Sequence, residues 1–79
     1  MPGACSANDG KKTSGQVYLG DDYYTKEMCI IACKNQEKAT GCEYRVTKKG
    51  CWYYTGQVKA AHGSHDYVCM ALIQLQRTL

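Results

Sequence analysis

The sequence predicts a small α+β domain in which one helix packs on a mostly antiparallel sheet of four or five strands, held together by three disulfide bonds. Six cysteines among 79 residues are an even number, at a density typical of disulfide-stapled domains. Residues 26–39 place apolar side chains at helical spacing, and short β-prone segments separated by turn residues surround them. The chain has no Phe and a mean hydropathy of -0.48, so its thin core requires covalent support.

Residues 1–79 are expected to form a single domain, because no repeat or linker divides them. Residues 1–15 are rich in small and polar side chains, which predicts a loosely ordered N-terminal arm anchored by Cys5. Residues 16–19 are short, apolar and β-prone, and Gly20, Asp21 and Asp22 follow as a turn signal. The first strand of the main sheet is expected there.

The helix predicted over residues 26–39 carries signals at both ends. Thr25 is suited to accept hydrogen bonds from the first turn, and Gly41 is expected to stop the helix. Cys29 and Cys33 are four residues apart, so their sulfur atoms project from the same helix face. Both cysteines are therefore expected to bridge to the sheet.

A hairpin is predicted after the helix. Residues 43–47 alternate as a half-buried strand, with Tyr44 and Val46 on one face and Glu43, Arg45 and Thr47 on the other. Residues 48–50 form the turn, in which Gly50 is expected to adopt a positive φ, and residues 51–55 return as a second strand.

A last buried strand is predicted over residues 66–73, after a loop over residues 56–65, and residues 74–79 are expected to fray. No apolar run approaches the roughly 20 residues that span a bilayer. The net charge of +3 is spread along the chain without a basic stripe, so nucleic acid is not an expected partner. The cysteines favour an oxidising compartment, and the protein is expected to be secreted or extracellular.

Metal and catalytic sites are not predicted. The cysteines lack paired C-x2-C spacing, and His62 and His65, the two candidates for metal binding, lie in a loop without helical spacing. Ser64 and Asp66 complete a possible Ser-His-Asp set, but all of it lies on one short loop with no oxyanion frame. Neither a cofactor nor an enzymatic activity is expected.

Four cysteine-containing fragments, in order, resemble the PAN/apple domains over residues 25–72. They are Cys29-Ile30-Ile31-Ala32-Cys33, Gly41-Cys42-Glu43-Tyr44, Gly50-Cys51-Trp52-Tyr53 and Tyr67-Val68-Cys69-Met70. The resemblance implies nested pairing of Cys29 with Cys51, Cys33 with Cys42, and Cys5 with Cys69. It also implies a non-catalytic extracellular module that binds a protein or a carbohydrate, as in cell adhesion or a lectin.

The outer face of the predicted hairpin is the candidate ligand surface. Aromatic rings flanked by polar side chains suit both a sugar and a protein hot spot. The candidate ligand-binding residues are Trp52, Tyr54, Arg45, Lys48, Lys49 and Tyr44. The alternative for Trp52 and Tyr54 is packing under the helix or a loop, as core residues.

Two other functions are compatible with the sequence. Lys48 and Lys49 at a stapled turn would suit a secreted effector mini-protein that blocks a protease or channel, or acts in host defence, because a pre-organised loop loses little entropy on binding. The seven tyrosines would suit a structural protein of the extracellular matrix.

Overall fold

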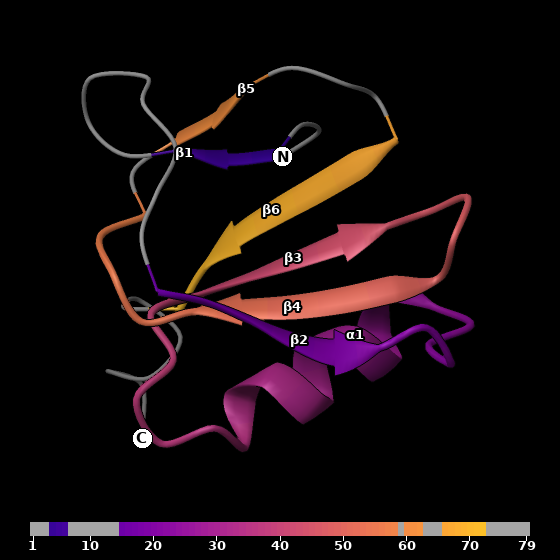
Figure 1. Ribbon diagram of the computed structural model, residues 1–79, viewed down its shortest axis with the longest axis horizontal. Helices are drawn as coiled ribbons and strands as arrows, with labels where there is room; N and C mark the ends of the chain where they lie inside the picture. The colour runs from indigo at the N-terminus through magenta and orange to yellow at the C-terminus, as the bar shows by residue number, and fades with distance from the viewer. Residues whose placement is uncertain (1–3, 7–14, 59, 63–65, 73–79) are drawn as a thin grey trace.

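The computed structural model describes residues 4–6, 15–58, 60–62 and 66–72 (Figure 1). Their elements are, in chain order, β1 (Ala4–Ser6), β2 (Gln16–Gly20), α1 (Lys26–Lys34), β3 (Gly41–Arg45), β4 (Gly50–Tyr54), β5 (Ala60–His62) and β6 (Tyr67–Ala71). The main sheet has the order β2-β4-β3-β6 with antiparallel neighbours throughout, and α1 packs on one face. The predicted helix on a four-stranded antiparallel sheet is confirmed. Strands β1 and β5 form a separate antiparallel pair.

The three disulfides join elements that are distant in sequence. Cys29 and Cys33, both in α1, bond to Cys51 in β4 and Cys42 in β3, and Cys5 in β1 bonds to Cys69 in β6. These pairs are the ones that the resemblance implies. All six cysteines are buried, so the disulfides occupy much of the interior that aliphatic side chains would otherwise fill.

The helix begins as expected and ends earlier than expected. The Thr25 Oγ1 accepts a hydrogen bond from the Met28 N–H at 3.2 Å, which caps the first turn. The last helical residue is Lys34, with Asn35 as the cap, and Gly41 begins β3 instead of stopping the helix. A tight turn after the helix reverses the direction of the chain, so that Cys42 can bond to Cys33.

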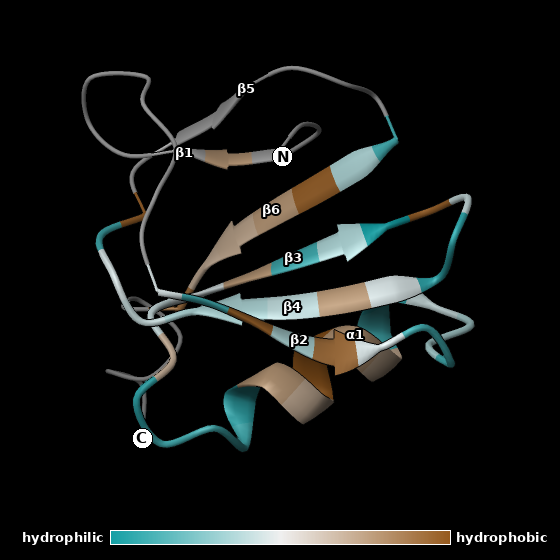
Figure 2. Cartoon of the chain, in the orientation of Figure 1, coloured by the Kyte–Doolittle hydropathy of each residue, from teal (hydrophilic) through white to brown (hydrophobic). Residues whose placement is uncertain are grey.

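The core between α1 and the sheet is small. Leu72 is fully buried against Cys33, Ala39 and Cys42, and Tyr44 is buried beside Cys29 and Cys51. Strongly hydrophobic positions occupy only short segments of the strands in Figure 2. Within the described residues, no helix is long and apolar enough to cross a membrane.

The sheet face turned away from α1 is half covered. β1 lies against β3 and β6, where the Cys5–Cys69 bond fixes it. The backbone N–H of Cys5 also donates to Glu43 Oε1 at 2.8 Å. Glu43 was expected on a solvated face and is instead only 3% exposed, because the β1–β5 pair adds a third layer at that end of the sheet.

Candidate functional site

The open half of this sheet face carries a row of three aromatic side chains, Tyr18, Trp52 and Tyr67. Arg45 lies between Trp52 and Tyr67, and we call the surface formed by these four residues the aromatic face. Tyr18 lies directly opposite Trp52 in the β2–β4 pair, and Arg45 lies opposite Tyr67 in the β3–β6 pair. Cys42 and Cys51 alternate with these positions and point to α1, so the aromatic face is on the far side of the sheet from the helix.

The three rings form a continuous, partly exposed row. The ring centroids of Tyr18 and Trp52 are 5.4 Å apart at 44°, and those of Trp52 and Tyr67 are 6.4 Å apart at 45°. These separations are within the attractive range for tilted aromatic pairs. Tyr18 is 52% exposed, whereas Trp52 and Tyr67 are half-buried. The row therefore combines ring surface that a ligand can reach with fixed geometry.

Gly50 provides the space that the Trp52 ring occupies. A Cβ at this position would lie 2.7 Å from Trp52 Cη2 and 2.9 Å from Cζ3, so the indole lies directly over the glycine backbone. The expectation of a positive φ at Gly50 is wrong, since Lys49 takes the left-handed conformation of the turn, with φ 55°. Glycine is required here by the close approach of the ring.

Arg45 is held in place by two neighbours. Its Nε donates to Asp66 Oδ2 at 2.8 Å, and its Cζ lies 5.4 Å from the centre of the Tyr67 ring. The hydrogen bond to Asp66 raises the pKa of Arg45 above its ordinary value. Stacking and ion pairing together pre-organise the guanidinium, whose side chain is 35% exposed.

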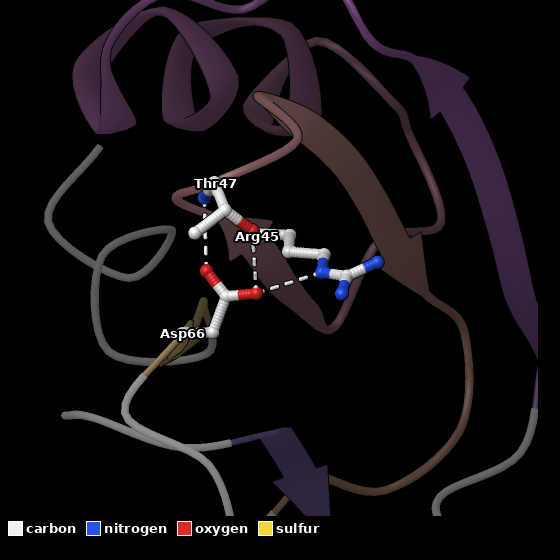
Figure 3. Close-up of polar contacts among 3 residues, drawn as sticks. All are labelled: Arg45, Thr47 and Asp66. Atoms are coloured by element: carbon white, nitrogen blue, oxygen red, sulfur yellow. Dashed lines mark hydrogen bonds and ion pairs between the residues drawn. The ribbon is translucent and has the colours of Figure 1, made fainter.

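Asp66 connects the start of β6 to the β3–β4 turn (Figure 3). Besides Arg45, it accepts from the Thr47 N–H through Oδ1 at 2.8 Å and from the Thr47 hydroxyl through Oδ2 at 2.7 Å. Arg45, followed by the Thr47 hydroxyl and N–H, lowers the pKa of Asp66 to about 2. Asp66 therefore fixes the edge of the aromatic face as a charged hydrogen-bond acceptor.

Asp66→Asn is expected to lower stability at pH 7, because it removes a charge that three donors stabilise. An Asp whose folded pKa is below its unfolded value of about 3.9 stabilises the protein above that value and loses this contribution as pH falls through the folded pKa. Urea unfolding with intact disulfides should show a difference in the free energy of unfolding between the wild type and the variant that is constant from pH 7 to 5. This difference should disappear between pH 4 and 2. A difference that does not depend on pH would contradict this assignment.

Tyr18 is tied to the turn that follows β2. Hydrogen bonding to Asp21, followed by burial and the Asp21 charge, raises the pKa of Tyr18 to about 12. The Asp21 carboxylate is exposed, and its Oδ1 would be 3.0 Å from a Cβ at Gly50. Asp21 and the Trp52 ring thus meet above the same glycine.

Two of the six ligand-binding candidates are buried, and for Tyr54 this is the core packing that the sequence left open as the alternative. Tyr54 is 2% exposed, and its hydroxyl donates to Glu43 Oε1 at 3.0 Å under the β1 layer. Burial, followed by the Glu43 charge, raises its pKa above the ordinary value. Tyr44 is 4% exposed on the α1 side, where its hydroxyl donates to the Tyr23 carbonyl at 2.7 Å. Both are core residues.

The other candidates are divided between the aromatic face and the hairpin turn. Trp52 and Arg45 lie in the aromatic face, as described above. Lys48 and Lys49 are exposed in the turn, and the Lys49 Nζ lies 5.5 Å from the centre of the Tyr24 ring, directed toward the loop before α1. Val46, which was expected on the same strand face as Tyr44, is exposed in this turn instead.

His62 and His65 are the two candidates for metal binding. His65 lies outside the described residues, and His62 belongs to β5, where only the backbone is described. Among the residues that the structure does describe, no three His, Cys, Asp or Glu side chains are grouped to hold a metal ion.

Tyr18, Tyr67 and Asp21 are members of the candidate site that sequence reasoning did not select. Alternation places Tyr18 on one face of β2 and Tyr67 on one face of β6. Only the order of the strands in the sheet shows that these two faces are on the same side.

Comparison with protein-family models, with curated proteins and with solved structures found no match to this chain.

Proposed function

We propose that this chain is a non-catalytic extracellular recognition domain that binds a carbohydrate on its aromatic face. The observation that carries the proposal is the row of Tyr18, Trp52 and Tyr67, partly exposed and fixed by their mutual contacts. Pyranose rings have apolar C–H faces that stack on aromatic rings, and their hydroxyls hydrogen-bond to neighbouring polar groups. Arg45, within the row, and Asp21, beside Trp52, supply such groups.

The size of the surface favours a sugar over a protein. A stable protein–protein interface takes about 800 Å² from each partner. The accessible parts of three rings and one guanidinium form a much smaller site, and the β1–β5 pair bounds it at one end. The resemblance to PAN/apple domains, which bind carbohydrates or proteins outside cells, supports the same proposal. So do the three disulfides, because they persist in oxidising compartments.

A glycan array probed with the folded, oxidised protein tests the proposal. We expect binding to a subset of glycans, and Trp52→Ala should weaken that binding about 10-fold or more because it removes the central ring. Tyr18→Ala, at the exposed end of the row, should also weaken it while perturbing the core less.

Ile31→Ala is the matched control, since Ile31 is 64% exposed on α1, across the sheet from the aromatic face. Near-UV circular dichroism would verify that each variant is folded. Unchanged glycan binding in folded Trp52→Ala and Tyr18→Ala, or no glycan bound by the wild type, would reject the proposal.

A further inference from the structure

Two polar groups with opposite hydrogen-bonding roles lie near Gly50, the glycine under the Trp52 ring: Arg45 in the aromatic face and Asp21 beside it. Arg45 lies opposite Gly50 in the β3–β4 pair, and Asp21 approaches the same glycine from the loop after β2. The Asp21 charge is also close enough to raise the pKa of Arg45. A ligand stacked on Trp52 would therefore meet a donor and an acceptor together.

The Arg45 guanidinium can donate further hydrogen bonds. Its bond to Asp66 uses Nε alone, and no described residue accepts from Nη1 or Nη2, which Figure 3 shows directed away from the Asp66 carboxylate. A guanidinium carries five N–H donors, so four are available on these two nitrogens. Because Asp66 and Tyr67 hold the group, a ligand would not have to order it.

The Asp21 carboxylate can accept further hydrogen bonds. This carboxylate is exposed, and the interaction with the Tyr18 hydroxyl uses at most one of the roughly four acceptor positions of that group. A sugar hydroxyl both donates and accepts, so neighbouring hydroxyls can accept from Arg45 and donate to Asp21. A carboxylate or sulfate group bound at Arg45 can only accept, so it cannot itself donate to Asp21 and would bring a further negative charge beside it.

The local charge also opposes an anionic ligand. The chain as a whole carries +3, but Arg45 is flanked by Asp21 and Asp66, which makes this group of three residues -1 at neutral pH (one positive, two negative). The nearby Lys49 ammonium is directed to Tyr24, on the loop before α1. Repulsion between an anionic ligand and nearby negative charges in a partly buried site is stronger than its attraction to distant, exposed positive charges.

We infer that the aromatic face selects neutral saccharides over carboxylated or sulfated ones, with Asp21 as the residue that determines this specificity. The inference rests on the proposed function. It contradicts the expectation from net charge alone, by which a basic extracellular domain would bind acidic polysaccharides.

Fluorescence of Trp52, the only tryptophan, can report binding directly. The probes are cellobiose, mannobiose and lactose as neutral sugars, with sialyllactose and a sulfated heparin disaccharide as anionic ones. We expect the best neutral probe to bind at least 10-fold more tightly than either anionic probe. Asp21→Ala should weaken binding of that neutral probe about 10-fold.

Asp21→Asn separates charge from hydrogen bonding, because it keeps an acceptor oxygen and removes the negative charge. We expect it to reduce the discrimination against sialyllactose several-fold, with a smaller effect on the neutral probe. Asp22→Asn removes the same charge from the adjacent exposed residue and should leave the discrimination nearly unchanged.

Preference for an anionic probe, or equal effects of Asp21→Asn and Asp22→Asn on discrimination, would overturn the inference while leaving carbohydrate binding intact. If no saccharide of either class binds in solution or on the array, the proposed function fails, and this inference fails with it.

Discussion

Reduction of all three disulfides should unfold the domain at neutral pH. In the chain-entropy description, the Cys5–Cys69 bond, with a separation of 64 residues, contributes on the order of 4 kcal/mol. The two bonds from α1, with separations of 22 and 9, contribute roughly 3 kcal/mol each. Because the three loops are nested, these values do not simply add. Even a partial sum is comparable to the roughly 5–15 kcal/mol that stabilises a typical domain.

Near-UV circular dichroism in excess reductant measures this directly. We expect the aromatic signal to collapse once mass spectrometry shows six free thiols. The double variant Cys5→Ser with Cys69→Ser is the matched comparison, since it frees β1 but keeps both bonds between α1 and the sheet. It should retain the helix and sheet signal. A reduced wild type with an unchanged near-UV spectrum would show that the core suffices alone.

Local signals predicted the main elements correctly. The helix start at Thr25 follows from capping, and the same-face placement of Cys29 and Cys33 follows from a four-residue spacing. The hairpin and the last strand were each located to within a few residues. All of these depend on interactions within one segment or between consecutive segments, which a sequence pattern records.

The errors share a different origin. Glu43 was assigned to solvent by strand alternation, yet a three-residue strand from the predicted arm covers it, from 38 positions away. The helix was extended to residue 39 because its periodicity continues, whereas the disulfide to Cys42 requires the chain to turn back after Lys34. No local pattern encodes where distant segments meet.

The candidate site was half predicted for the same reason. Trp52 and Arg45 were identified from the hairpin alone, since both lie on its outer face. Tyr18 and Tyr67 lie on strands that flank the hairpin, and the order β2-β4-β3-β6 was not predictable from one sequence. Tyr54 was left open between a ligand contact and core packing, because the layer above that face was unknown.

Glu43→Ala is expected to destabilise the domain by about 3 kcal/mol. The Glu43 Oε1 accepts from both the Cys5 N–H, at 2.8 Å, and the Tyr54 hydroxyl, at 3.0 Å. Removing it leaves two donors in a buried environment, and each unsatisfied group costs about 1–3 kcal/mol. Urea unfolding with intact disulfides would measure the change.

Glu43→Gln separates the loss of an acceptor from the loss of charge. It keeps an amide oxygen at similar reach for both donors, so its cost should be about 1 kcal/mol, well below that of Glu43→Ala. Tyr54→Phe removes one of the two donors and also ends the bond from Gln16 Nε2 at 2.8 Å, so an intermediate cost is expected. Equal costs for the Ala and Gln variants would contradict this assignment, because the acceptor oxygen kept by Glu43→Gln would then contribute nothing. A cost that decreases from Glu43→Ala through Tyr54→Phe to Glu43→Gln would show that the buried Glu43 side chain fixes the third layer on the sheet. The same side chain would then set the boundary of the aromatic face.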